Sequence, residues 1–192
     1  TSFEQRPRCA PHVAHTSTSS ALPVRTSSAA LTVSKIADVS VNLVAQGNSG
    51  AVEFGFTDAS LAATAQTGNL TVDGQTGAIT FNDEGGTNKL ETIAITSSNT
   101  ASTVALTTTN VGTTKITVAG AANLTLSGTQ SAAVVTLDAS AATGNVSATL
   151  AGATANVVMT GGSGNDTLQS NGVLDDSLVG GAGNDTLLLD DD

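Results

Sequence analysis

Three nine-residue units near the C-terminus bring glycine and aspartate into a regular pattern. They read GGSGNDTLQ at 161–169, NGVLDDSLV at 171–179 and GGAGNDTLL at 180–188, with Ser170 inserted after the first unit. The outer two units match the pattern G-G-x-G-x-D-x-U-x, where U is a large apolar residue, and the middle unit matches it in part. Glycine lets carbonyl oxygens turn inward and aspartate adds a carboxylate, so these units are suited to binding Ca²⁺.

Two such units form one turn of a stacked coil, so the first and third should lie at one edge and the second at the opposite edge. Gly161 and Gly180 begin the outer units 19 residues apart. The ideal separation is about 18 residues, and we expect Ser170 to loop out and absorb the difference. Asp166 and Asp185 are the predicted carboxylate ligands, with backbone carbonyls completing the shell. The predicted metal site comprises Gly161, Gly162, Ser163, Gly164, Asp166, Gly180, Gly181, Ala182, Gly183 and Asp185.

Two weaker acidic candidates lie outside this pair of units. Asp176 keeps the sixth position of the middle unit, and we include it among the metal ligands, although Leu174 replaces a glycine and disfavours a complete site at that edge. Asp83 and Glu84 precede two glycines, a pattern that could hold another ion but is more typical of a turn. A flexible Gly/Asp-rich tail is the alternative for the C-terminus, and the tandem nine-residue spacing favours calcium binding over it.

The elements that position these units are short strands. From Leu31 onward, runs rich in Val, Ile, Leu and Thr alternate with Gly, Asn, Asp and Ser, as in successive strands and turns. Aromatic residues make up 2% of the chain, so we expect a core of small side chains. Such a core suits a solenoid of stacked strands better than a β-sandwich, which usually has large aromatic residues in its core. The runs cover 31–33, 39–44, 51–56, 69–72, 78–81, 92–96, 103–107, 115–118, 123–126, 134–137, 146–150 and 157–160.

The sequence therefore predicts an all-β, right-handed parallel β-solenoid that ends in a calcium-binding β-roll. We place the solenoid at 31–160, with a cap or a sandwich-like unit as the alternative for its early part, and the β-roll at 161–192. Residues 1–30 differ in composition: they hold all three prolines, the single cysteine, both histidines and three of the six basic residues. We expect this segment to be a flexible leader or linker.

Composition excludes several classes of function. The formal net charge of −10 disfavours nucleic acid as a partner, because like charges repel. No apolar run approaches the length of about 18 residues needed to span a bilayer, so we expect no membrane insertion. Residues 31–192 contain no His and no Cys, which leaves a nucleophilic Ser without the usual base, and we expect the protein not to be an enzyme.

The nonapeptides resemble those of the RTX (repeats-in-toxin) family of calcium-binding β-roll proteins. The stretch 90–188 is similar to RTX-type surface-layer (S-layer) proteins of Gram-negative bacteria, in the run LETIAI at 90–95 and in LDASAATG at 137–144 before GGSGND. This resemblance implies calcium as the cofactor, export by type I secretion to the bacterial cell surface, and a lattice of identical subunits. It also implies cell-surface polysaccharide as a partner, bound through regions outside this chain.

Three functional hypotheses follow. The first is a secreted structural protein that binds calcium and self-assembles into an extracellular array. The second is a calcium-dependent adhesin or ligand-binding module, ice included, because Thr-rich turns such as 107–109 could form a flat face. The third is a fragment of an RTX-carrying hydrolase. We favour the first, because the acidic, Thr-rich turns lack both catalytic groups and the aromatic side chains on which sugars stack.

Overall fold

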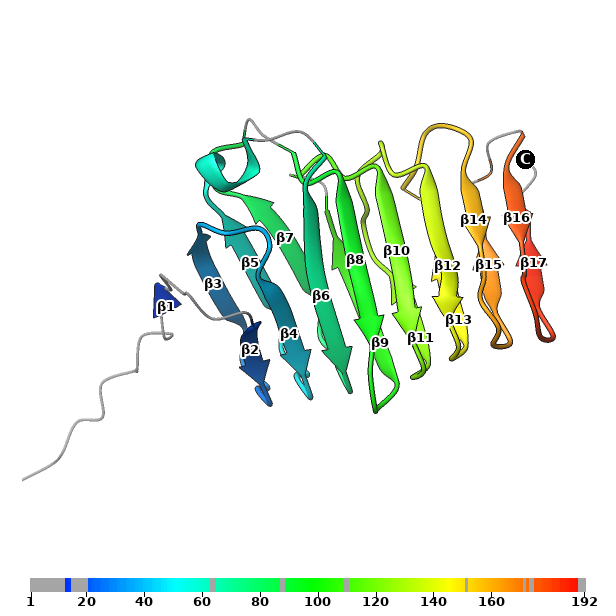
Figure 1. Cartoon of the computed structure of the whole chain (residues 1–192), viewed down its shortest axis with the longest axis horizontal. Helices are drawn as coiled ribbons and strands as arrows, with labels where there is room; N and C mark the ends of the chain where they lie inside the picture. Colours follow the sequence, from blue (N-terminus) through cyan, green and yellow to red (C-terminus); the bar gives the residue numbers. More distant parts are fainter. Residues whose placement is uncertain are drawn as a thin grey trace, which may run out of the picture.

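The computed structural model describes residues 13–14, 21–62, 65–86, 89–108, 111–150, 152–170, 172 and 175–189. Over these residues the chain forms an all-β parallel solenoid, whose two sheets contain nine and eight strands. Two sheets lie face to face along its length (Figure 1). The only helical segment among the described residues is the short 3₁₀ helix η1 (Asp58–Leu61), and none of them forms a helix long and apolar enough to cross a membrane. The predicted all-β solenoid is confirmed.

Each turn contributes one strand to each sheet, and every strand except the outermost pairs in parallel with the strands one turn before and one turn after it. The odd sheet contains β1 (Val13–Ala14), β3 (Leu31–Ile36), β5 (Val52–Phe56), β7 (Ile79–Asp83), β9 (Ser102–Thr107), β11 (Leu124–Ser127), β13 (Val146–Thr149), β15 (Thr167–Gln169) and β17 (Thr186–Leu188). The even sheet contains β2 (Ala21–Arg25), β4 (Asn42–Gln46), β6 (Thr67–Asp73), β8 (Thr92–Ser97), β10 (Lys115–Gly120), β12 (Thr136–Ala142), β14 (Val158–Thr160) and β16 (Ser177–Val179).

Turn length rises and then falls along the chain: Ala21 and Asn42, register partners on β2 and β4, are 21 residues apart. Gln46 and Asp73, which are register partners on β4 and β6, are 27 residues apart. Near the C-terminus the stacked residues Asn165 and Asn184 are only 19 residues apart. A shorter turn encloses a narrower cross-section, so the C-terminal turns have room only for small and medium-sized aliphatic side chains.

Aromatic side chains fill the wider N-terminal turns. Phe54, Phe56 and Phe81 are at most 1% exposed. The ring centroid of Phe81 lies 5.8 Å from that of Phe54 and 6.1 Å from that of Phe56. The core of the C-terminal half is aliphatic and contains larger side chains, such as Leu137 and Met159, than the small ones expected, whereas the N-terminal half is built around this aromatic cluster.

The solenoid begins earlier than the predicted boundary at residue 30. β2 pairs with β4, and the backbone of β1 pairs with β3, although both strands lie in the segment expected to be a leader. Leu22 and Val24 point inward and are buried, while Pro23 between them is exposed. Proline is tolerated there because β2 is the outermost strand of its sheet. The rest of the predicted leader, 1–12 and 15–20, lies outside the described residues.

The early part of the solenoid is neither a separate cap nor a sandwich. From β2 onward the strands belong to the same two parallel sheets as the C-terminal turns. The nonapeptide loops therefore lie at the narrow end of one continuous stack, and the preceding turns determine their position.

Candidate metal centre

The first and third nonapeptide loops lie directly above one another. β15 follows the first loop and pairs with β17, which follows the third. β16 follows the middle unit and lies in the other sheet, beside β14. The two complete units therefore share one edge of the solenoid, as their spacing predicts.

Ser170 does not loop out. Its side chain is 2% exposed, and its N–H donates to the carbonyl of Leu188 at 3.0 Å. This bond continues the parallel pairing of β15 and β17 by one residue, so the expectation that Ser170 is a solvent-exposed insertion was wrong. The pairing holds the residue inside because an unpaired backbone N–H there would be costly to bury.

Asp166 occupies a position that is apolar in the preceding turns. By register, the residues below it are Val146 and Leu124, both of which are in the core. Asp166 is itself only 1% exposed. Its Oδ1 accepts the N–H of Val146 at 2.7 Å, and its Oδ2 accepts the N–H of Gly162 at 2.6 Å. Two backbone donors thus hold this buried carboxylate in place.

Asp185 lies one turn beyond Asp166 and is more exposed. Its Oδ1 accepts the N–H of Asp166 at 2.9 Å. Its Oδ2 lies against Gly180, where a Cβ would collide with it. The carboxylates of both outer units therefore face the same stacked pair of loops.

Oxygen atoms converge where the glycines of these loops meet. A Cβ at Gly161 would collide with the carbonyl oxygen of Gly180 and lie 2.5 Å from Asp166 Oδ2. At Gly181, where φ is +94°, a Cβ would collide with the carbonyl oxygen of Gly162. Side chains at these positions would fill the space that the oxygens surround, so glycine is required there.

The remaining predicted residues of the outer units also lie in the two stacked loops. A Cβ at Gly183 would collide with the carbonyl oxygen of Gly164, so these two glycines also stack closely. Ser163 and Ala182 are exposed, and their N–H groups donate to carbonyls of the preceding turn, at 3.0 and 2.9 Å. The structure therefore brings all ten predicted residues of the outer units to one edge.

The donor set fits calcium. Ca²⁺ takes six to eight oxygen ligands and accepts carbonyls and carboxylates alike. Within the part of the chain that the structure describes, no group of three or more His, Cys, Asp and Glu side chains gathers. The oxygens at the two loops are instead backbone carbonyls with two carboxylates, Asp166 and Asp185. When bound, calcium would neutralise these carboxylates and join the two turns.

Asp176 lies at the opposite edge, apart from the other two aspartates. Its Oδ1 accepts the N–H of Val157 at 2.8 Å. Its Oδ2 is buried and has no hydrogen-bond partner. A buried carboxylate oxygen without a donor is costly, and a cation would satisfy it. Leu174, on which the doubt about this edge rested, lies outside the described residues.

Asparagines in the same turns were missed by sequence reasoning. Asn145 and Asn123 stand in register below Asn165 and Asn184 of the nonapeptides and are hydrogen-bonded to them in series. The available signal was the dipeptide Gly-Asn, which recurs at 144–145, 164–165 and 183–184.

The carboxylates of Asp83 and Glu84 both accept backbone N–H groups. Asp83 Oδ1 accepts the N–H of Gly85 at 3.0 Å. Glu84 Oε1 accepts the N–H of Lys35 at 2.8 Å. These contacts favour the turn interpretation over a second ion site.

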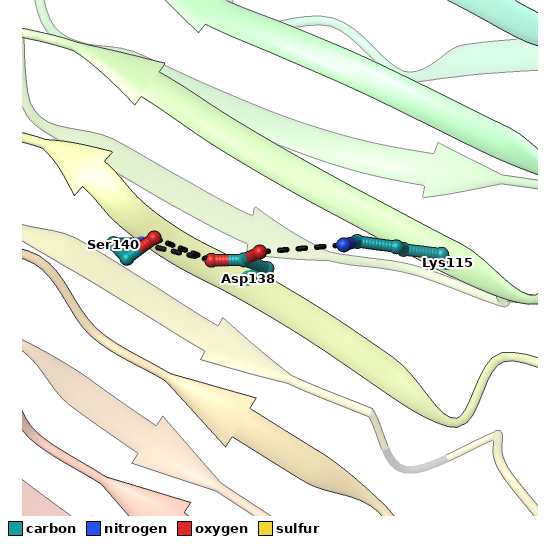
Figure 2. Close-up of polar contacts among 3 residues, drawn as sticks. All are labelled: Lys115, Asp138 and Ser140. Carbon is teal, nitrogen blue, oxygen red and sulfur yellow. Dashed lines mark hydrogen bonds and ion pairs between the residues drawn. The ribbon is translucent and has the colours of Figure 1, made fainter.

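Asp138 forms an ion pair on the outer face of the even sheet. Its carboxylate accepts bonds from the Ser140 hydroxyl at 2.7 Å and the Ser140 N–H at 3.2 Å, and it lies 3.3 Å from Lys115 Nζ (Figure 2). The Ser140 hydroxyl, supported by its N–H and by Lys115, holds the pKa of Asp138 below its ordinary value, although partial burial opposes this.

Replacing Ser140 with alanine is expected to raise the pKa of Asp138 towards its ordinary value. Because the folded pKa is depressed, ionised Asp138 stabilises the fold above its unfolded pKa of about 3.9, and this contribution is lost as the pH falls through the folded pKa. The variant should therefore be less stable than wild type at neutral pH and equal to it in acid. Carboxyl NMR titration measures the shift. Ser147→Ala is the control, and an unchanged Asp138 pKa in Ser140→Ala would contradict this account.

Stacked parallel turns with glycine- and aspartate-rich loops at their edges define a β-roll at the end of a parallel β-solenoid. Residues 144–173 and 170–192 match the family model of the RTX calcium-binding nonapeptide repeat (4 copies). The C-terminal turns thus carry RTX repeats, which supports Ca²⁺ as their ligand. The match begins at residue 144, ahead of the predicted start at 161. No curated protein and no solved structure matches the chain.

Proposed function

We propose that this protein is a secreted structural protein of the bacterial cell surface, which binds calcium and self-assembles into a surface layer or a similar extracellular array. The observation that carries this proposal is the stacked pair of loops at 161–166 and 180–185, which present oxygen ligands and match the RTX repeat. RTX repeat proteins are typically extracellular and secreted, which supports export. Type I secretion is part of the same proposal.

The negative charge of the C-terminal turns supports a structural role for calcium. After Lys115 the sequence contains no Lys or Arg and eight Asp residues. Negative charges close together repel one another and oppose compact stacking. A divalent ion that binds only the folded turns would offset this repulsion and stabilise the narrow end of the solenoid.

The last turns support contact between copies. All the large hydrophobic side chains that are exposed within the described ranges lie there: Val158, Val179, Leu187, Leu188 and Leu189. Leu187 is 42% exposed, whereas its register partner Leu168 is fully buried. β16 and β17 are also the outermost strands of their sheets. Apolar side chains beside sheet edges favour association with another copy.

Assembly can be tested by negative-stain microscopy and sedimentation of the full chain in calcium and in EGTA. We expect ordered oligomers or arrays in calcium. Leu188→Glu should weaken assembly, because it places a charge on the apolar end, whereas Thr103→Glu on an exposed site of β9 serves as the control. Monodisperse monomers under both conditions would exclude the proposal.

A ligand-binding or adhesive face is the second candidate. One outward column of the odd sheet carries a hydroxyl in five successive turns: Thr103, Thr125, Ser147, Thr167 and Thr186. A flat row of hydroxyls suits recognition of a repetitive ligand such as a polysaccharide or ice. Glycan binding and inhibition of ice recrystallisation by the calcium-loaded protein would test it, and Thr125→Lys should abolish either activity. If wild type is inactive in both assays, this candidate falls.

We propose no catalytic role, because residues 31–192 contain neither His nor Cys. The net charge of −10 likewise argues against nucleic acid as a partner. Cell-surface polysaccharide, bound through regions outside this chain, is the partner that surface anchoring would require.

A further inference from the structure

Four asparagines form a ladder at the edge that carries the two calcium loops. The N–H of Asn145 donates to Asn123 Oδ1 at 2.9 Å, and the N–H of Asn165 donates to Asn145 Oδ1 at 2.8 Å. The N–H of Asn184 donates to Asn165 Oδ1, also at 2.8 Å. Asn165 and Asn184 belong to the two complete nonapeptides, Asn145 lies at the start of the RTX match, and Asn123 precedes it. The ladder therefore runs from turns in which Leu124 and Val146 replace the aspartate directly into the candidate site.

The aspartates form bonds in the reverse direction. Asp166 Oδ1 accepts the N–H of Val146, and Asp185 Oδ1 accepts the N–H of Asp166. Successive turns are thus joined by a reciprocal pair of bonds, in which an asparagine of the earlier turn and an aspartate of the later turn both accept backbone N–H groups. Residues 145–146 and 165–166 are joined by such a reciprocal pair of bonds, although residues 145–146 contain no carboxylate.

Backbone contacts extend the match between the turn at 142–146 and the first calcium loop. The carbonyl of Ala142 accepts the N–H of Ser163 at 3.0 Å. A Cβ at Gly164 would lie 2.6 Å from the carbonyl oxygen of Gly144. The first calcium loop is therefore stacked closely on a turn of similar path that has no acidic ligand.

We propose that Asn145 is a positioning residue for the calcium site, which rests on calcium binding by the two loops as proposed above. Its Oδ1 holds the backbone N–H of Asn165, the residue immediately before Asp166. This bond sets the loop so that the Asp166 carboxylate is in place before calcium arrives. Calcium then binds without having to order the loop, and a smaller ordering cost means tighter binding. The turn at 142–146, which contains no carboxylate, thereby serves as a template for the loop that carries Asp166.

Calcium titration of the full chain by calorimetry tests this role. Asn145→Ala removes the acceptor and is expected to raise the Kd for calcium about fivefold, the effect of one lost hydrogen bond. Asn145→Asp keeps an acceptor oxygen in the same place, so its affinity should be no weaker than that of wild type. Asn69→Ala, on β6 of the other sheet, is the matched control and should leave the Kd unchanged.

Amide hydrogen exchange of the wild-type protein in EGTA gives a second readout that needs no variant. If Asn145 sets the loop before calcium binds, the N–H of Asn165 should be protected without calcium. An unchanged Kd in Asn145→Ala, or free exchange of the Asn165 amide in EGTA, overturns the positioning role. Wild-type protein that binds no calcium overturns calcium binding by the loops itself, and this result is seen before any substitution is made.

Discussion

Replacing Asp166 and Asp185 together with alanine is expected to abolish the ordering of the C-terminal turns by calcium. These are the two carboxylates that the stacked loops bring to one edge, and neutral carbonyls alone bind calcium weakly. The wild-type site should have a Kd of about 0.1 to 1 mM, as in other extracellular calcium modules, and the double variant should bind at least about 100-fold more weakly. Calorimetry measures the Kd, and circular dichroism with and without calcium measures the gain of β structure.

A second double variant separates metal binding from hydrogen bonding. Alanine at position 166 also leaves the N–H groups of Val146 and Gly162 without their acceptor. Asp166→Asn with Asp185→Asn retains an acceptor oxygen at each position and removes the charge, and it should lose calcium binding as well. Asp38→Asn with Glu53→Gln removes the same charge in the N-terminal turns and serves as the control. A wild-type calcium response in the asparagine variant would contradict the assigned ligands.

Truncating Phe81 to alanine is expected to destabilise the fold by about 3–5 kcal/mol. Phe81 is fully buried, and its ring packs near those of Phe54 and Phe56 in the widest turns. Strand pairing on both sides fixes the spacing of the turns, so the cavity cannot collapse. Because each turn is supported by its neighbours, the loss should spread to adjacent turns. Urea unfolding in EGTA measures the effect without a contribution from calcium.

The control for this change is Leu189→Ala. Leu189 follows β17 and is 61% exposed, so its truncation leaves no cavity and should cost well under about 1 kcal/mol. If Phe81→Ala proved as mild as Leu189→Ala, the aromatic cluster could not be the main anchor of the N-terminal turns.

Strand positions could be predicted from the sequence because their signals are local. Each of the twelve predicted runs overlaps one of the strands β3 to β14. Runs of β-branched and aliphatic residues between glycine-containing turns carry that information within a few neighbouring residues. β1 and β2 were missed because they lie among prolines and polar residues, so only their pairing with β3 and β4 reveals them.

The nonapeptide frame was also visible in the sequence, since its constraints lie within each unit. Gly181 and Gly183 adopt φ values of +94° and +117°, which glycine tolerates and other residues avoid. The stacking of the outer units could also be predicted, because the 19 residues between their starts are close to twice the unit length. The burial of Ser170 could not be predicted, because it depends on a backbone bond to Leu188 one turn away.

By itself, the sequence determined that this protein is a stack of short parallel strands ending in glycine- and aspartate-rich loops suited to calcium. Which residues stand above one another was decided only by the tertiary structure, because the turn length varies between 19 and 27 residues and no single period aligns them. The asparagine ladder, the row of outward hydroxyls and the core position of Asp166 all depend on that alignment. All three features are formed by residues of different turns. Strand register, and not distance along the chain, brings those residues into contact.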